Sequence, residues 1–487
     1  MTGRPGRVVI VGGGIAGMAA ACFLRDSGAE VTVLEGSGRI GGKLAVSDVA
    51  GIAVDSGAEA LLARRPEGIE LIRSAGLADQ LVYPGTTTAR LWTRGEFRPL
   101  PARQFMGVPA DFGDLERSGI LSPAGLDRAR QDALLPATAR AGDTSVGHHV
   151  AARFGAEVVD RLVEPLLGGV YAGRPEQLSF EATLPALAAA SRQQASLAAA
   201  AGTLLGPPQS PSGPAARPQT PVFTTLAGGL GSLPQALAAV AGAAIRTGVM
   251  ARELARTEHG WRLTVGPAAA PEQLDADAVV LALPARPASR LVGQLPGADG
   301  AAAALAEIEY ASVAIVTLAY PSAAFAVPLG GSGYLVPAVD GRPVKAVTFS
   351  TVKWPHLVAG QPAGRGLVVV RCSMGRIGEE AVLQRDDAEL IALAAGEFAA
   401  ATGVVGRPAG ARVSRWGGGL PQYTVGHLDR VARIRSGIAA QPGLAVCGAA
   451  YEGVGVPACI ATARAAATQV LRHLRESKAA GVVGGHG

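Results

Sequence analysis

The 487-residue sequence has little charge and few aromatic side chains: 17% of its residues are Asp, Glu, Lys or Arg, and 4% are Phe, Trp or Tyr. Because 48% are hydrophobic, the chain falls outside the disordered class, and its length predicts more than one domain. No basic run or basic–aromatic stripe stands out, which argues against nucleic acid as a partner. The net charge of +5 comes mainly from Arg, which suits an anionic small molecule because Arg holds carboxylates and phosphates through paired hydrogen bonds.

Cysteine is also scarce. The four cysteines are not spaced as Cys-x-x-Cys and lie in mostly apolar surroundings, so we expect reduced, buried core residues and neither disulfides nor metal ligands: Cys22, Cys372, Cys447 and Cys459. No stretch has the pattern of a secretory signal, and the longest uncharged runs, 193–216 and 310–339, are interrupted by Pro and Gly. These absences predict a cytoplasmic protein without a membrane span and leave peripheral contact with a membrane surface open.

Residues 7–35 carry the strongest motif. Val8–Val11 is a short β-branched run, as expected for a strand buried on both faces. Gly12, Gly14 and Gly17 follow in the order Gly-x-Gly-x-x-Gly, which allows a tight turn, approach of a pyrophosphate to the backbone, and close packing of a helix on the strand. Glu35 ends the next strand, where a carboxylate accepts hydrogen bonds from a ribose. Together these residues predict a dinucleotide-binding unit.

A second glycine loop follows this unit. Arg39 precedes Gly41-Gly42-Lys43, and an NAD-binding Rossmann domain needs no such loop. The spacing from Glu35 resembles the Glu-x-x-x-Arg-x-Gly-Gly signature of a large superfamily of FAD oxidases, which includes amine oxidases, carotenoid desaturases and porphyrinogen oxidases. In that resemblance Arg39 faces the pyrophosphate, and the loop Gly57–Ala60 lies against the flavin ring.

Hydrophobic periodicity predicts the remaining elements. Hairpins are expected at 43–55 and 90–101, and a mainly helical region at 112–205. A turn-rich block is predicted at 164–173 and a mobile Pro/Ser/Gly-rich loop at 206–221. We expect the strands within 244–265 and 278–283 to return to the first sheet. Strands of a second sheet are predicted at 311–320, 333–339, 345–350 and 367–372.

The order of these elements predicts an α/β protein with a discontinuous Rossmann-type domain, a mixed-sheet substrate domain and a helical insertion. A last strand at 444–447 leads through a loop into a helix that begins near Pro457. The N-terminus of that helix would stabilise negative charge on a reduced flavin ring. The predicted FAD-binding pieces are 1–90, 222–286 and 412–487; the predicted substrate-side pieces are 91–221 and 287–411.

Three blocks carry a closer resemblance. Glu164–Gly173, Leu420–His427 and Gly448–Ile460 together resemble the protoporphyrinogen/coproporphyrinogen oxidase family, with an amine-oxidase-like architecture, over nearly the whole chain and in the family's order. The stretches Lys353–His356 and Val454–Pro457 are most similar to the soluble Gram-positive and actinobacterial type, which oxidises coproporphyrinogen III. The flavin loop departs from the family's usual Gly-Pro-Asp/Glu-Ser.

The resemblance implies a function. It implies non-covalently bound FAD and the six-electron oxidation of coproporphyrinogen III to coproporphyrin III in haem biosynthesis, with O2 as acceptor and H2O2 as product. Protoporphyrinogen IX oxidation is one alternative. An amine oxidase on the same scaffold is another, although its cavity would need acidic groups and a facing pair of aromatic side chains. A flavin-binding assembly protein without turnover is a third. Transient contact with the next enzyme of the pathway stays open.

The resemblance also implies site residues. No metal site is predicted, because His148-His149 lacks further ligands at metal spacing. Arg64 and Arg65 are candidates for the substrate's propionates, with Arg65 also a candidate for catalytic positioning; a solvated pair at a helix start is the alternative. The other substrate candidates are Arg90, Arg174 and Lys353. The implied FAD contacts are Gly12, Gly13, Gly14, Ile15, Ala16, Gly17, Glu35, Arg39, Gly42, Lys43, Gly57, Ala58, Glu59, Ala60, Ala251, Trp416, Gly453, Val454 and Gly455.

Overall fold

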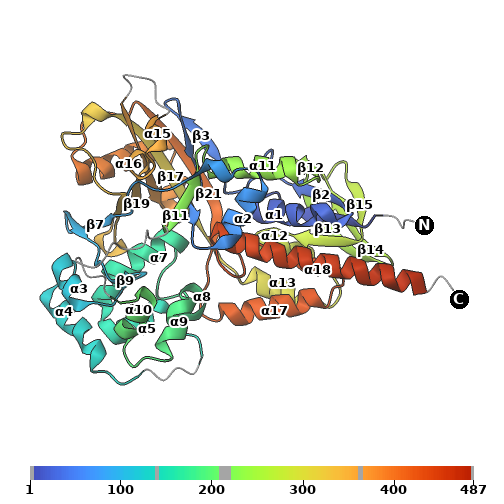
Figure 1. Ribbon diagram of the computed structural model, residues 1–487, viewed down its shortest axis with the longest axis horizontal. Coiled ribbons are helices and arrows are strands. Elements are labelled where there is room, and N and C mark those ends of the chain that lie inside the picture. The colour runs from blue at the N-terminus through green and yellow to red at the C-terminus, as the bar shows by residue number, and fades with distance from the viewer. Residues whose placement is uncertain (1–4, 138–141, 208–220, 360–365, 484–487) are drawn as a thin grey trace.

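The computed structural model describes residues 5–137, 142–207, 221–359 and 366–483 (Figure 1). One half contains a parallel sheet beside the long helix α18 (Val456–Val483), the other half contains a larger mixed sheet, and a group of helices lies below that mixed sheet in the view of Figure 1. Within the described residues, every helix is too short or too polar to cross a membrane. The predicted α/β class with two sheets and a helical insertion is confirmed, whereas the domain boundaries stay predictions.

The parallel sheet is assembled from segments that are far apart in the sequence. Its order is β12-β2-β1-β16-β22, and every neighbouring pair is parallel. Strand β1 lies at the centre with both faces covered, which explains its unbroken apolar run. The five strands are β1 (Arg7–Val11), β2 (Glu30–Glu35), β12 (Ala244–Thr247), β16 (Ala278–Leu281) and β22 (Leu444–Val446).

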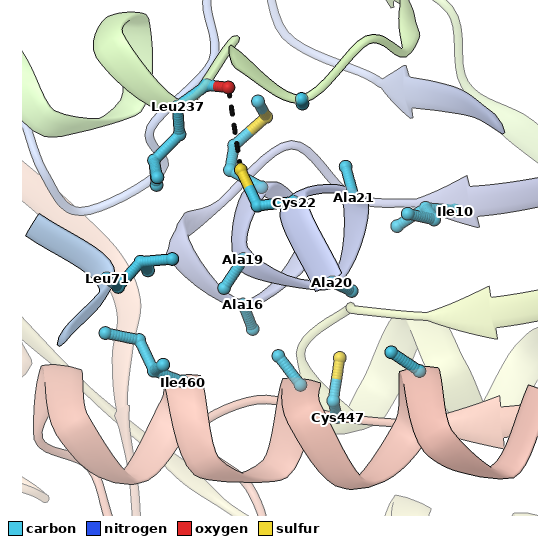
Figure 2. Packing of buried hydrophobic residues seen from close by; sticks show 14 of the residues in the cluster. Ile10, Ala16, Ala19, Ala20, Ala21, Cys22, Leu71, Leu237, Cys447 and Ile460 are labelled. Atoms are coloured by element: carbon cyan, nitrogen blue, oxygen red, sulfur yellow. Dashed lines mark hydrogen bonds between the residues drawn. The ribbon is translucent and has the colours of Figure 1, made fainter. Parts of the chain in front are cut away.

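Helix α1 (Ile15–Leu24) is packed on one face of this sheet through small residues. Figure 2 shows its alanines surrounded by Ile10 of β1, Leu71, Leu237 and Ile460 of α18. Small side chains let α1 approach β1 and α18 closely, so the first glycine loop and the start of α18 are held by one core. Cys22 donates a weak Sγ–H hydrogen bond to the Leu237 carbonyl oxygen (3.6 Å). All four cysteines are free and buried, as predicted.

One expectation for the middle of the chain is wrong in part. Only β12 and β16 join the parallel sheet; the strands between them form a separate antiparallel sheet in the order β13-β14-β15. This small sheet packs its apolar face on the opposite side of β1 and β16 from α1, where Trp261 is fully buried. Its strands are β13 (Ala251–Thr257), β14 (Gly260–Val265) and β15 (Glu272–Ala276), and its companion helices are α12 (Ala285–Val292), α13 (Asp299–Ala306) and α17 (His427–Ala439).

The larger sheet has seven strands in the order β21-β17-β20-β19-β18-β7-β8, and only the β18–β7 pair is parallel. Helix α16 (Asp387–Thr402) covers one face, where Tyr320, Phe349 and Phe398 form an aromatic core. Along β20, Val370 and Cys372 point to α16, so Arg371 between them points to the other face. The strands are β7 (Ala89–Thr93), β8 (Glu96–Pro99), β17 (Tyr310–Pro321), β18 (Gly333–Leu335), β19 (Val344–Phe349), β20 (Leu367–Met374) and β21 (Gly410–Pro421).

Short elements link the two halves. The hairpin β3–β4 is antiparallel as predicted, and its apolar residues pack on Ala319 and Val369 of the larger sheet. A three-stranded sheet in the order β5-β11-β6 lies beside α2 and α18. These elements are β3 (Val46–Val49), β4 (Ile52–Asp55), β5 (Leu61–Leu62), β6 (Leu81–Val82), β11 (Phe223–Leu226), α2 (Pro66–Ser74), α11 (Leu233–Val240), α14 (Ser350–Lys353) and α15 (His356–Ala359).

The region 112–205 is helical as predicted, but the turn-rich block expected at 164–173 is wrong. Helix α7 (Glu164–Tyr171) continues from the π-helical stretch Val159–Val163, and Ala172 ends it in a left-handed conformation with φ +50°. Pro165 lies next to the junction with the π-helical stretch, and burial of Leu167 and Tyr171 outweighs the low helix propensity of the two glycines.

The other helices of this region are α3 (Phe112–Ser118), α4 (Pro123–Arg130), α5 (Val146–Phe154), α6 (Ala156–Val158), α8 (Phe180–Thr183), α9 (Pro185–Ser191) and α10 (Leu197–Leu205), and the short strands β9 (Gln104–Phe105) and β10 (Val108–Pro109) precede it. Most of the loop predicted at 206–221 lies outside the described residues.

Candidate functional site

The first glycine loop, Gly12–Gly17, has the geometry of a phosphate-binding turn. Gly12 adopts φ +110°, and a Cβ on Gly17 would lie 1.8 Å from the Gly12 carbonyl oxygen, so α1 can follow β1 this closely only with glycine. A Cβ on Gly14 would meet no heavy atom within 4 Å, so the loop is open there. Helix α1 begins at Ile15, and its first N–H groups have no partners within the helix.

The second glycine loop packs directly on the first. Gly41 N–H donates to the Gly13 carbonyl oxygen at 2.8 Å, and Gly14 and Gly41 form a short parallel bridge. Arg39 Nη2 donates to the Gly42 carbonyl oxygen at 2.7 Å, and its guanidinium lies 5.8 Å from the centroid of the Trp416 ring. The structure therefore brings together predicted cofactor residues from opposite parts of the sequence.

Glu35 lies at the carboxyl end of β2, next to the first loop. Its Oε2 accepts from Gly13 N–H at 2.8 Å, and its Oε1 accepts from Ser37 N–H at 2.7 Å. Its backbone oxygen accepts from Val249 N–H at 2.9 Å, which places the turn before Ala251 at the same edge of the sheet. A carboxylate has about four acceptor positions, so Glu35 can still accept a ribose hydroxyl.

Lys43 lies between the second glycine loop and the loop Gly57–Ala60. Water reaches its side chain, yet surrounding protein desolvates the ammonium group and lowers the pKa of Lys43. Its carbonyl oxygen accepts from Ala58 N–H at 3.1 Å, and a Cβ on Gly57 would lie 1.9 Å from that oxygen. Trp416 Nε1 donates to the Ser56 carbonyl oxygen at 2.9 Å. Glycine at position 57 is therefore what allows these segments to meet.

The loop 448–455 in front of α18 is held by two buried aromatic side chains. Tyr423 Oη donates to the Ala449 carbonyl oxygen and accepts from Gly453 N–H, both at 2.7 Å. The His427 ring stacks on Tyr423 with 3.8 Å between centroids, and its Nε2 lies 3.2 Å from the Tyr451 carbonyl oxygen. Burial lowers the pKa of His427 to about 4, so the ring is neutral near pH 7. This loop is therefore fixed at three backbone positions.

The start of α18 lies beside the second glycine loop. Burial raises the pKa of the Cys459 thiol to about 11, and the Lys43 ammonium group acts in the opposite direction on it. Cys459 N–H donates to the Gly455 carbonyl oxygen at 3.1 Å, so Gly455 belongs to the first turn of α18. The predicted residues Gly453, Val454 and Gly455 therefore lie where the N-terminus of α18 approaches the other predicted cofactor residues.

A cluster of buried charges lies around the loop Gly57–Ala60. Glu59 forms ion pairs with Lys353 of α14 (Nζ–Oε1 2.6 Å) and with Arg371 of β20, and Arg371 Nη2 also donates to the Gly57 carbonyl oxygen. Burial would raise the pKa of Glu59, but the two cations together lower it to about 2. Next to them, the Asp55 carboxylate accepts from the N–H groups of Leu230 and Gly231, both at 2.9 Å.

The predicted substrate residues are not all brought together. Arg64 is exposed, and Arg65 is paired with Glu67 at 2.6 Å on the surface. Arg174 is exposed and donates to the Ile377 carbonyl oxygen at 3.3 Å. Lys353 is engaged by Glu59, as described above.

Arg90 lies on a different face of the larger sheet from Arg371. Its guanidinium is 4.7 Å from the centroid of the Phe97 ring and donates to the Gly330 carbonyl oxygen at 3.0 Å. Phe97 packs with Tyr334 in the core under α16, whereas Arg371 points away from α16. The substrate roles of these basic residues stay predictions.

Sequence reasoning missed Arg371, Tyr423 and Asp55. Arg371 had a detectable signal, because a single charge inside the apolar run of β20 requires a buried partner. Tyr423 lies in a block that was recognised as a motif but was not given a role. Asp55 ends a hairpin strand, and nothing in the sequence shows that its carboxylate accepts from backbone 175 residues away.

The described residues fit a dinucleotide that carries an aromatic ring system. Two glycine loops present backbone N–H groups and an open position at Gly14, Arg39 offers cationic charge, and Glu35 offers acceptors. Lys43 contacts the Gly57–Ala60 loop, and Trp416 holds the residue that precedes this loop. The arrangement can hold a redox cofactor; among the described residues no group of three metal-ligating side chains occurs.

Comparison with known proteins gives the same picture. The family described as "Flavin containing amine oxidoreductase" matches residues 15–471. The chain is 36% identical to coproporphyrinogen III oxidase of Mycobacterium tuberculosis (strain ATCC 25618 / H37Rv) over 478 residues, which covers 96% of this chain and 98% of that protein. It is 30% identical to coproporphyrinogen III oxidase of Bacillus subtilis (strain 168) over 475 residues, with the same shares covered.

A solved structure resembles the whole chain. The protein from Exiguobacterium sp. 255-15, which carries a provisional protoporphyrinogen oxidase name, superimposes with a TM-score of 0.83 and 29% identity over 96% of this chain and 99% of that one. Cyclohexylamine oxidase from Brevibacterium oxydans IH-35A superimposes with a TM-score of 0.68 at 17% identity over 97% of this chain and 100% of that one, a likeness of fold alone.

Proposed function

The chain belongs to the family of flavin-containing amine oxidoreductases, and from that premise we propose that it is an FAD-dependent coproporphyrinogen III oxidase of haem biosynthesis. The reaction removes six electrons and gives coproporphyrin III, with O2 as acceptor and H2O2 as product. One observation carries the proposal: relatives named for this activity match 96% of this chain and 98% of their own length.

FAD, when bound, supplies the acceptor for hydride equivalents from the substrate. The residues of this chain bind and orient it: the loops at Gly12–Gly17 and Arg39–Lys43 hold the phosphates, and Glu35 accepts a ribose hydroxyl. The N-terminus of α18 places a partial positive charge near Lys43. The positive charge of the helix N-terminus would favour a reduced flavin ring that is negatively charged. The proposed chemistry therefore requires no catalytic triad and no metal ion.

Basic side chains are proposed to bind the propionates of the substrate. Arg64 and Arg65 lie just before α2 on the surface, and the ion pair between Arg65 and Glu67 is solvent-exposed. An exposed pair contributes about 0–1 kcal/mol, so Glu67 can give way to a carboxylate of the substrate. Arg174 and Arg90 are further proposed anchors; each is already held by a backbone carbonyl, which fixes the position of its guanidinium.

The proposed location is the cytoplasm. Four free, buried cysteines are consistent with a compartment that keeps thiols reduced. The proposed partners are the porphyrinogen and O2, with transient contact to the following enzyme of the pathway or to a membrane surface as a further part of the proposal.

The purified protein mixed with coproporphyrinogen III in air tests the function. We expect porphyrin fluorescence to rise together with H2O2, faster than with protoporphyrinogen IX. A higher kcat/KM for protoporphyrinogen IX would make that compound the substrate. Bleaching of the flavin by amines alone would point to an amine oxidase, and a yellow protein that none of these compounds reduces would be a binding protein without turnover.

A further inference from the structure

Two cationic side chains hold the loop Gly57–Ala60 through Glu59, which is part of that loop. We call Glu59, Lys353 and Arg371 the loop clamp. Their side chains are 14%, 16% and 8% exposed, so each charge is largely removed from water. Glu59 is bonded by both cations, one at each carboxylate oxygen. Arg371 makes a second bond, to the Gly57 carbonyl oxygen, so it holds the loop by side chain and backbone at once.

The clamp joins two halves of the molecule. Arg371 comes from the middle of β20 in the larger sheet, and Lys353 comes from the end of α14, which packs beside β20. The loop itself leaves the hairpin β3–β4 and touches the second glycine loop at Lys43. Glu59 is the only charged residue of the sequence Gly57-Ala58-Glu59-Ala60, so it is the one side chain there that cations can hold.

The hydrogen bonds of the loop clamp are more specific than is needed only to hold the loop against the larger sheet. Burying an ion pair costs a large desolvation free energy, and packed hydrophobic residues often stabilise a fold as well. Here, however, the guanidinium of Arg371 donates to both Glu59 and the Gly57 carbonyl oxygen, so one rigid group holds a side chain and the backbone of the loop. The indole N–H of Trp416 also donates to the carbonyl oxygen of Ser56, the residue before the loop.

We propose that Arg371 and Lys353 are positioning residues, which pre-set the Gly57–Ala60 backbone for the flavin through Glu59. Lys353 is thereby assigned to the cofactor loop and not to the substrate. The inference rests on the proposed function in one respect: it takes Gly57–Ala60 as a loop that contacts the flavin. Without the clamp the loop keeps its sequence but loses the conformation that the cofactor needs.

The test uses the full chain with Arg371→Met, Arg371→Lys and Lys353→Met. The readouts are the FAD dissociation constant and the visible absorption spectrum of the bound flavin, with thermal stability alongside. We expect Arg371→Met to weaken FAD binding about tenfold or more and to shift the spectrum, because it removes two charge-assisted hydrogen bonds. Arg371→Lys keeps the charge without the fork and should restore part of both, and Lys353→Met should have the smaller effect.

The matched control is Asp132→Asn. Asp132 is paired with Arg153 in the helical region, and the two side chains are 0% and 4% exposed, so this pair is at least as buried as the clamp. We expect the control to lower thermal stability with the FAD dissociation constant and the flavin spectrum unchanged. Arg371→Met with wild-type FAD affinity and spectrum would overturn the proposal, and so would a control that shifts the spectrum equally.

Two further results separate the outcomes. If Arg371→Met does not fold, Lys353→Met compared with Lys353→Arg carries the test, since only the arginine can still hold Glu59; equal flavin spectra in these two variants would overturn the proposal. A protein that binds FAD but does not oxidise coproporphyrinogen III would refute the proposed substrate and leave the clamp standing, because none of the readouts involves turnover.

Discussion

Gly17 and Gly14 are three residues apart in the first loop, yet they serve different needs. A Cβ at Gly17 would lie 1.8 Å from the Gly12 carbonyl oxygen, whereas a Cβ at Gly14 would meet no heavy atom within 4 Å. Gly14 also has ordinary helix-entry dihedral angles, with φ −70°. Gly17 is therefore required by the fold, whereas Gly14 is required only when a ligand occupies the open side of the loop.

This difference predicts opposite behaviour of two alanine variants. Gly17→Ala should lower the free energy of unfolding by about 3 kcal/mol or more, because backbone atoms have to move. Gly14→Ala should change it by about 0.5 kcal/mol or less. It should nevertheless weaken FAD binding about tenfold by filling the space for the pyrophosphate. Denaturant unfolding and FAD titration measure the two effects; equal losses of stability would contradict this assignment.

His427 supplies a prediction about pH. Burial lowers its pKa from 6.5 to about 4 in the folded protein, so between these values the unfolded chain binds a proton that the folded protein does not. Stability therefore rises with pH through this window, and lowering the pH from 7 to 4.5 should cost about 2–3 kcal/mol at this residue. His427→Phe keeps a ring against Tyr423 and cannot titrate, so its stability should fall less over the same range. Thermal unfolding at both pH values is the measurement, and an equal drop in both proteins would exclude this role.

At the scale of elements, strand β21 and helix α17 control the loop that precedes α18. Tyr423 follows β21, and its backbone carbonyl accepts from Ser179 N–H at 2.7 Å, while its hydroxyl group binds the loop 448–455. One residue thus contacts the helical region on one side and the cofactor loop on the other. A shift of the helical region would therefore be passed on to the loop.

Tyr423→Phe should uncouple the loop with little change in packing. It removes two hydrogen bonds to buried backbone groups, worth about 1–2 kcal/mol together, so FAD binding should weaken about 5- to 30-fold. Tyr320→Phe is the matched control: Tyr320 is equally buried, in the aromatic core under α16, and should leave the FAD dissociation constant unchanged. Equal FAD affinity in the two variants would show that the loop holds its conformation without Tyr423.

The elements also show what sequence reasoning can reach. The parallel sheet, the β3–β4 hairpin and the strands β17 to β20 of the larger sheet follow from apolar periodicity, because burial on one or two faces leaves a trace in the order of residues. That β21 and the hairpin β7–β8 complete the larger sheet was not predicted. The separate sheet β13–β15 and helix α7 were not predicted. Periodicity does not identify a strand's neighbour, and tertiary packing overrides the propensity of Gly168 and Gly169.

The candidate site was likewise predicted only in part: local motifs were recognised, and contacts between distant residues were not. The spacing of glycines identifies such loops in the sequence, and the residues at Gly12–Gly17 and Arg39–Lys43 were predicted from that spacing. The ion pair between Glu59 and Lys353 joins residues 294 positions apart, and no local pattern records such a partner. The prediction of Lys353 as a substrate residue was therefore made without knowledge of its ion pair with Glu59.

At the scale of the whole molecule, the net charge of +5 bears on the encounter with substrate. A positively charged protein attracts a polyanion at long range, and dissolved salt screens that attraction. Arg64 and Arg174 are exposed and contribute to this field. The attraction grows with the number of carboxylates on the substrate.

Salt should therefore discriminate between substrates. Raising the ionic strength from about 0.05 M to 0.5 M should raise KM for the tetracarboxylate coproporphyrinogen more than for the dicarboxylate protoporphyrinogen, with kcat little changed. Steady-state rates at both ionic strengths measure this. An identical salt effect on both compounds would mean that binding depends on the macrocycle and not on its propionates.

Strand β1 lies between β2 and β16, with Val8 opposite Ala278, and β22 is added beyond β16. A ribosome that adds roughly 5–20 residues per second therefore releases the first phosphate loop roughly 20–90 s before the last strand and α18 exist. Once β16 has been made, its outer edge stays without β22 for the rest of that interval, and the cofactor site lacks the N-terminus of α18. We therefore expect the flavin to bind after translation, and we expect translation products that stop before α18 to be colourless.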